Sequence, residues 1–131
     1  MSASARPLSP FTTIYRWQIQ MVTSIVHRIT GVALAFGTIL LCVALLALAS
    51  GPDAFASVRA FCASWPGLVL LFGWSWALSF HLLNGIRHLL QDVGMGFTIA
   101  QFVRNSWIAM IGSFALTALL WAFVFAQGGV V

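Results

Sequence analysis

The chain has 131 residues, of which 61% are hydrophobic and 6% are charged. A soluble domain carries roughly 25% charged residues, so much of this surface must face lipid, and the 14% aromatic content argues against a disordered chain. The net charge of +4 comes from arginines that are scattered along the chain. They form no patch that could follow a phosphate backbone, which excludes a nucleic-acid partner.

Three apolar runs without charged residues follow one another along the chain: 29–49, 66–86 and 107–126. A run of about 20 residues lets a helix cross the roughly 30 Å hydrocarbon core, and a helix satisfies its own backbone hydrogen bonds there. We therefore expect an all-α integral membrane protein with three transmembrane helices in a bundle. The expected organisation is a single domain, 1–131, with an N-terminal arm and three helices: 1–19, then about 20–49, 66–90 and 105–127.

Turn-forming residues separate these runs. The first run is followed by Ser50-Gly51-Pro52-Asp53, which predicts a helix end. Trp65-Pro66 begins the second run with proline at a position that a helix tolerates. The second helix is expected to end at Gln91-Asp92-Val93-Gly94.

The arginines predict the orientation of the spans. Three spans put the N-terminus and the second loop on one side, together with five arginines: Arg6, Arg16, Arg28, Arg87 and Arg104. Only Arg59 falls on the other side. The positive-inside rule therefore predicts a cytoplasmic N-terminus and a periplasmic C-terminus. The first apolar run begins near residue 29 and is long enough to span, so no cleaved signal peptide is expected.

The first candidate site lies at the cytoplasmic mouth of the first helix. If that helix reaches back to about residue 20, one face carries five residues at spacings of three and four: Gln20, Ser24, His27, Arg28 and Gly31. Their hydroxyl, imidazole and guanidinium donors suit a carboxylate or the carbonyl oxygen of a polar head group. The alternative is that Arg28 and His27 only reach toward lipid phosphates.

The second candidate site is a histidine in a stripe of small residues at four-residue spacing: Gly73, Ala77, His81 and Gly85. Small residues admit a close neighbour, either another helix or a flat macrocycle, and imidazole is the usual axial ligand of haem iron. His81 could instead bond a neighbouring helix. His88, about two turns nearer the cytoplasm, is the rival ligand, and Asn84 could orient a ligand or bond a helix carbonyl. Because a six-coordinate haem needs two axial ligands and one histidine lies deep in a span, a second protein chain, or a second copy of this one, must supply the other.

Two segments resemble a known family, the cytochrome b subunit, or C-type membrane anchor, of succinate dehydrogenase (succinate:quinone oxidoreductase, respiratory complex II). The first segment has three parts: Arg6-Pro7-Leu8-Ser9-Pro10, Ile14-Tyr15-Arg16 and Ser24-Ile25-Val26-His27-Arg28-Ile29-Thr30-Gly31. The second has two parts: His81-Leu82-Leu83-Asn84-Gly85-Ile86-Arg87-His88-Leu89 and Asp92-Val93-Gly94. Together they cover about a third of the chain.

The resemblance implies a set of roles. His81 would be an axial ligand of haem b, with the second ligand from a D-type membrane anchor subunit. Ser24 and Arg28 would help form the ubiquinone pocket, and His27 and Arg28 would lie near the haem propionates. His88, Asn84 and Arg87 are secondary candidates.

The resemblance also implies the partners. They are a flavoprotein subunit carrying FAD, an iron–sulfur subunit and the D-type anchor, in a lipid bilayer. The N-terminus shows no evident organelle-targeting segment, which favours a bacterial inner membrane. Succinate oxidation is not expected from this chain alone. Two alternatives stay open: the anchor of a fumarate reductase that uses menaquinol, and a membrane assembly protein without redox function.

Overall fold

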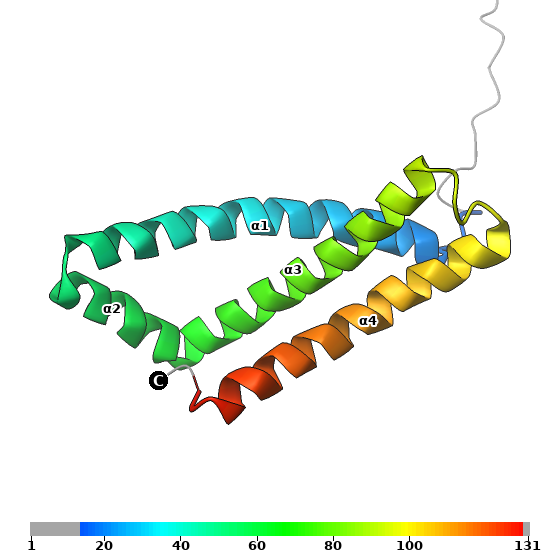
Figure 1. The fold of residues 1–131 in the computed structure, drawn as a ribbon. Coiled ribbons are helices and arrows are strands. Elements are labelled where there is room, and N and C mark those ends of the chain that lie inside the picture. Colours follow the sequence, from blue (N-terminus) through cyan, green and yellow to red (C-terminus); the bar gives the residue numbers. More distant parts are fainter. Residues whose placement is uncertain (1–13, 130–131) are drawn as a thin grey trace, which may run out of the picture.

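The computed structural model describes residues 14–129, and every element in that range is a helix (Figure 1). In chain order the helices are α1 (Ile19–Ser50), α2 (Pro52–Ala63), α3 (Trp65–Asp92) and α4 (Ile99–Ala126). The start of the N-terminal arm, with Arg6 and the Arg6–Pro10 part of the first motif, lies outside the described residues.

Three of these helices are long and apolar enough to cross a membrane, namely α1, α3 and α4. The prediction of three spans in an all-helical chain is confirmed. The 12-residue α2 is too short to cross, and it occupies the connection between the first two spans, where the sequence analysis expected only a turn. α4 begins at Ile99, earlier than the expected 105.

The end of α1 and the start of α2 follow from three adjacent residues. Gly51 has a φ of +128°, which is unfavourable for any residue with a side chain, and so ends α1. Pro52 is the first residue of α2, where its missing N–H removes no helical hydrogen bond. Asp53 lies in the first turn, where the helix dipole carries a partial positive charge that favours a carboxylate. The next junction is equally short, because Ser64 caps α3 by accepting a hydrogen bond from the Gly67 N–H at 3.3 Å.

Two capping motifs form the connection between α3 and α4. The N–H of Gly94, at φ +84°, donates to the Gln91 carbonyl at 2.8 Å, and the Met95 N–H donates to the Leu90 carbonyl at 3.0 Å. This pair of bonds is a Schellman motif and explains why α3 ends at Asp92. Thr98 and Gln101 then form a capping box, which is why α4 begins at Ile99.

α3 is the central helix and contacts both α1 and α4 (Figure 1). We call the region where α1 begins, α3 ends and α4 begins the histidine end, and the opposite region the α2 end. α1 and α3 cross toward the histidine end and diverge toward the α2 end, where α2 joins them. The helices therefore form a wedge whose narrow part gathers residues from α1, α3 and α4.

The helix interfaces are built from small and hydroxyl-bearing residues. On α1 and α4 the buried residues are Thr23, Thr30, Gly37, Ser106, Ala109, Ser113 and Thr117. The hydroxyl groups among them donate to carbonyl oxygens of their own helix, which satisfies their protons within the helix. Large apolar side chains such as Leu46, Ile111 and Leu119 point outward. Close packing of small residues with an apolar exterior is typical of helices that associate in lipid.

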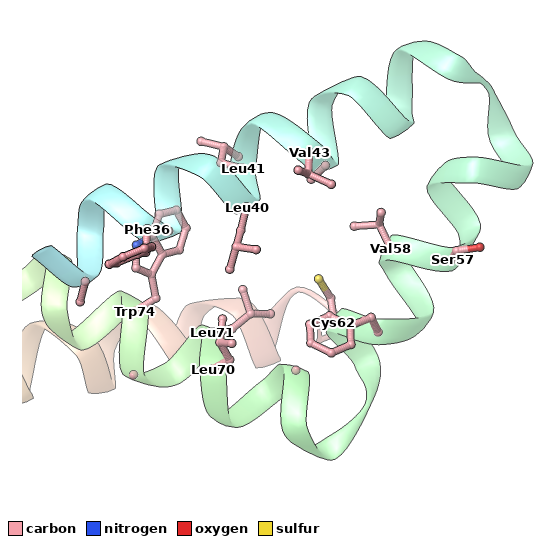
Figure 2. Close-up of a pocket in the computed structure, with 16 residues that line it drawn as sticks. Phe36, Leu40, Leu41, Val43, Ser57, Val58, Cys62, Leu70, Leu71 and Trp74 are labelled. Carbon is pink, nitrogen blue, oxygen red and sulfur yellow. The ribbon is translucent and has the colours of Figure 1, made fainter.

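One glycine sets the closest approach of α1 to α3. A Cβ atom at Gly37 would lie 2.0 Å from Nε1 of Trp74, so only glycine leaves room for the indole. Beyond this contact, toward the α2 end, the helices enclose an apolar cavity of about 740 Å³. Figure 2 shows Leu40 of α1, Val58 and Cys62 of α2 and Leu71 of α3 around it. Gly37 and Trp74 line the part of this cavity nearest the histidine end, together with Ala33 and Phe36.

Candidate functional site

Three histidines gather at the histidine end. The rings of His27 on α1 and His81 on α3 are stacked, with centroids 3.9 Å apart and an interplanar angle of 10°. The ring of His88 lies 5.2 Å from that of His27 at 55°. We call these three side chains the histidine cluster. The sequence analysis assigned them to two separate candidate sites, and the structure brings them into one.

His81 is held by α1 on three sides. Its Nδ1 lies 3.3 Å from Oγ1 of Thr30. A Cβ atom at Gly31 would lie 3.1 Å from Cε1 of the ring, so the glycine leaves space for the ring edge. One ring face is covered by His27. The other nitrogen, Nε2, makes no hydrogen bond to the described residues and is not among the buried atoms that lack a partner.

The expected face of α1 is only partly turned toward α3. Because α1 begins at Ile19, all five of its candidate residues are helical. Gln20, Ser24, His27 and Gly31 are half-buried, whereas Arg28 is exposed. The hydroxyl of Ser24 and the guanidinium of Arg28 make no side-chain hydrogen bond within residues 14–129. Both groups are thus available to a molecule outside the chain, and the buried Nδ1 of His27 also lacks a partner.

Asn84 and Arg87 lie on the side of α3 that faces α4. Arg87 Nη1 donates to Oδ1 of Asn84 at 2.9 Å, and the guanidinium carbon lies 4.5 Å from the centroid of the Phe102 ring. Both residues are deeply buried: the exposed fraction is 0% for Asn84 and 6% for Arg87. Asn84 is therefore engaged with Arg87, and the structure does not bring it to the ring of His81. His88 is exposed, as expected for a residue near the end of a span.

The stripe of small residues on α3 is covered only in its middle. Ala77 is buried, but a Cβ atom built at Gly73 or at Gly85 would meet nothing within 4 Å. Gly73 lines the apolar cavity between α1, α2 and α3, whereas nothing within residues 14–129 packs against the position of a Cβ atom at Gly85. The space beside Gly85 is therefore open to a neighbour from outside the described residues.

Sequence reasoning missed Thr30, although it lies within the first motif. Its signal is a seven-residue spacing: Thr23, Thr30 and Gly37 are the buried residues of α1, two turns apart from each other. This spacing identifies the face of α1 that packs on α3. What the spacing cannot give is the residue of α3 that lies opposite each position.

The chemistry available to the histidine cluster is that of a single imidazole ligand. Across residues 14–129, no group of three or more His, Cys, Asp or Glu side chains is arranged to hold a metal ion. A histidine with Nδ1 hydrogen-bonded and Nε2 accessible can bind one axial position of a macrocyclic metal. Cationic and hydroxyl groups on the neighbouring turns of α1 can bind carboxylate or carbonyl oxygens.

Comparisons with known proteins place the chain in a family. Residues 2–125 match the sequence model described as succinate dehydrogenase/fumarate reductase transmembrane subunit. The chain is 43% identical over 114 residues to the succinate dehydrogenase cytochrome b556 subunit of Paracoccus denitrificans, which covers 87% of this chain and 88% of that protein.

Two further relatives agree. The identity is 42% over 116 residues with the cytochrome b556 subunit of Rickettsia prowazekii (88% of this chain, 90% of the relative). It is 42% over 114 residues with the mitochondrial cytochrome b560 subunit of Sus scrofa (82% and 65%). A family match over nearly the whole chain and three such relatives lead to one conclusion: the chain belongs to the transmembrane subunits of succinate dehydrogenase and fumarate reductase.

Proposed function

We propose that this chain is the membrane anchor that binds haem b in a succinate dehydrogenase and helps form its ubiquinone-reduction site. The observation that carries the proposal is the environment of His81, whose Nδ1 is bonded to Thr30 while Nε2 stays accessible. The relatives named cytochrome b subunits support haem as the group that this nitrogen binds. When bound, haem b supplies one-electron redox chemistry within the membrane.

The second axial ligand would come from a D-type membrane anchor subunit. His81 is the only histidine of this chain in the stripe of small residues, and the open space at Gly85 leaves room for a neighbour beside α3. That neighbour would complete the bundle. Transmembrane helices associate through such small residues. The same stripe would therefore contact both the partner helix and the haem that the two chains share.

His27 and Arg28 would bind the haem propionates. The exposed guanidinium of Arg28 has no counter-charge in the described residues, and the buried Nδ1 of His27 has no hydrogen-bond partner. A propionate would satisfy both groups through charge-assisted hydrogen bonds. The stacking of His27 on His81 keeps these groups close to the ligand nitrogen.

Ser24 and Arg28 would also bind ubiquinone. They lie one turn apart on α1, and neither side chain is used within the described part of the chain. The Ser24 hydroxyl would donate a hydrogen bond to a quinone oxygen, and Arg28 would stabilise the negative charge that develops there as electrons arrive. Both roles need only donors that are already present at the mouth of α1.

The remaining chemistry would lie on other subunits. A flavoprotein with FAD would oxidise succinate, and an iron–sulfur subunit would pass the electrons to the quinone pocket. Both would dock on the cytoplasmic side of a bacterial inner membrane, which is the side that the arginines predict for the N-terminus and the 93–98 connection.

The ligand assignment is tested with two histidine variants of the complex purified from its native membrane. His81→Leu should abolish or strongly alter the haem b band in the reduced-minus-oxidised spectrum, because it removes the axial nitrogen. His88→Leu is the matched control on the same face of α3, and it should change the band less. A larger loss with His88→Leu would reverse the assignment.

The direction of the reaction is a separate question, because the family description includes fumarate reductases. Succinate:ubiquinone and menaquinol:fumarate activities should be measured on the same preparation. A preparation faster with succinate and ubiquinone supports the proposal. One that is faster with menaquinol and fumarate supports the second candidate, and a complex without haem or redox partners would leave only an assembly role.

A further inference from the structure

Thr30 links the two helices that form the histidine cluster. It is buried, with 2% of its surface exposed, and its Oγ1 has two neighbours. The carbonyl oxygen of His27, on the same helix, lies at 3.0 Å. Nδ1 of His81, on α3, lies at 3.3 Å and is 51 residues away in the chain.

The number of protons decides how these contacts are shared. A threonine hydroxyl has one proton to donate and lone pairs that accept. A carbonyl oxygen can only accept, so the Thr30 hydroxyl donates its proton to the backbone carbonyl of His27. Oγ1 of Thr30 then accepts a hydrogen bond from Nδ1–H of His81. This arrangement places the proton of a neutral His81 on Nδ1 and leaves the lone pair on Nε2.

The same surroundings fix the direction of the ring. Gly31 leaves space for the ring edge at Cε1, and His27 covers one ring face at 3.9 Å. A ring flip would exchange the hydrogen-bonding edge of the imidazole for its carbon edge at Thr30. The hydroxyl of Thr30 is thus the polar group that distinguishes one ring orientation from the other.

We propose that Thr30 is a positioning residue for His81: by accepting a hydrogen bond from Nδ1–H, it sets the tautomer and orientation in which Nε2 binds iron. The inference rests on the proposed ligation of haem b by His81. Hydrogen bonds of this kind to metal-bound histidines make the imidazole a stronger electron donor, and their loss costs roughly 10- to 100-fold in metal affinity or activity.

Thr23 provides a matched control. It lies two turns before Thr30 on the same face of α1, and it is fully buried. Its hydroxyl makes the same kind of bond to its own helix, donating to the Gln20 carbonyl at 3.1 Å, but it has no contact with a histidine nitrogen. Thr23→Val and Thr30→Val therefore each remove one intrahelical hydrogen bond of the same kind. Only Thr30→Val also removes the bond to His81.

The experiment uses the complex purified with its partner subunits, as wild type and as Thr30→Val, Thr30→Ala, Thr30→Ser and Thr23→Val. Haem b per complex and the midpoint potential of the haem are the readouts. Thr30→Val and Thr30→Ala should lower haem affinity roughly 10-fold or more. The potential of the haem that remains should rise, because a weaker donor stabilises ferric iron less. Thr30→Ser and Thr23→Val should behave as wild type.

Three results would overturn the inference. The first is an unchanged haem content and potential in Thr30→Val and Thr30→Ala. The second is an equal shift in Thr23→Val, which would assign the effect to α1 packing. The third is assembly of the complex with Thr30→Ser but not with Thr30→Val or Thr30→Ala. That result would mean that the hydroxyl is needed for folding. Failure of the proposed function looks different, because wild-type complex would then lack haem b or His81→Leu would retain it.

Discussion

Arg87 illustrates how a cation is accommodated between two membrane-spanning helices. It lies in α3 against α4, where its guanidinium donates a hydrogen bond to the side-chain Oδ1 of Asn84 and lies over the ring of Phe102. A buried charge normally has an opposite charge beside it. Here an amide dipole and the negative face of an aromatic ring take that place. The sequence analysis only counted this residue among the arginines of the cytoplasmic side and as a secondary site candidate, and it did not predict its burial against α4.

Ser24 carries the most direct prediction for quinone chemistry. Ser24→Ala should lower quinone reductase activity roughly 10-fold, since one hydrogen bond to the quinone oxygen contributes about 1.4 kcal/mol. Haem content should stay near that of the wild type, because within residues 14–129 the Ser24 hydroxyl makes no hydrogen bond to the histidine cluster. Activity with ubiquinone and haem per complex are measured on the same preparation.

Thr38→Ala is the control for that experiment. Thr38 is an exposed hydroxyl residue of the same helix, and it bonds only the Leu34 carbonyl, at 2.9 Å. Its loss should leave both readouts unchanged. If Ser24→Ala lowers haem content and activity in equal proportion, the residue does not have a separate role toward quinone.

At the scale of the elements, the contact between α1 and α3 depends on Gly37. Gly37→Ala should destabilise the complex by about 1–3 kcal/mol, because the new methyl group overlaps the indole of Trp74 and forces the helices apart. Thermal unfolding of the purified complex, followed by loss of the haem band, measures the effect. The helix propensity gained on replacing glycine by alanine works in the opposite direction.

Trp74→Leu tests the packing effect in a double-mutant cycle, because it removes the indole atoms that the new methyl group would overlap. Gly37→Ala should cost less stability in the Trp74→Leu background than in the wild type. An equal cost in both backgrounds would contradict a special role for the contact between Gly37 and Trp74.

The sequence predicted the spans well because their signal is local. About 20 uncharged apolar residues suffice to define α1, α3 and α4, and Gly51 and Gly94 mark helix ends where φ is positive. It missed α2, because Gly51-Pro52 was interpreted only as a turn, although a proline followed by Asp53 is also a good helix start.

The candidate site could be predicted only as two halves. Spacing put His27 on one helix and His81 on another. Their relative height, meaning their positions along the axis of the bundle, depends on how α1 and α3 pack. That height is set by contacts between residues far apart in sequence, at Gly31 and His81 and at Gly37 and Trp74. The bond from His81 to Thr30 is a consequence of this register, so no local pattern could reveal it.

At the scale of the whole molecule, the described arginines are unequally distributed between the two ends. Arg16, Arg28, Arg87 and Arg104 belong to the histidine end, and Arg59 lies in α2 (Figure 1). The fold thus gathers basic residues from three separate helices at one end of the bundle. Cytoplasmic placement of the histidine end is the arrangement that the positive-inside rule favours.

Labelling with a membrane-impermeant thiol reagent tests this orientation. In a chain with Cys42 and Cys62 replaced by serine, Asp53→Cys in α2 should react from the periplasm of intact cells. Val93→Cys, in the exposed turn after α3, should react only after the cells are opened. The reverse labelling pattern would indicate the opposite orientation of the chain in the membrane and would contradict a cytoplasmic N-terminus.

The crossing of α1 and α3 also fixes the order of events during synthesis. Thr30 and His81 are 51 residues apart, and the intervening chain includes the α2 end of the wedge, at the opposite side of the bundle. The C-terminal half of α3 must therefore leave the ribosome and enter the bilayer before His81 can meet its partners on α1. Until then His27 and Thr30 sit in a lone first helix, so the nascent chain cannot present the histidine cluster to any cofactor prematurely.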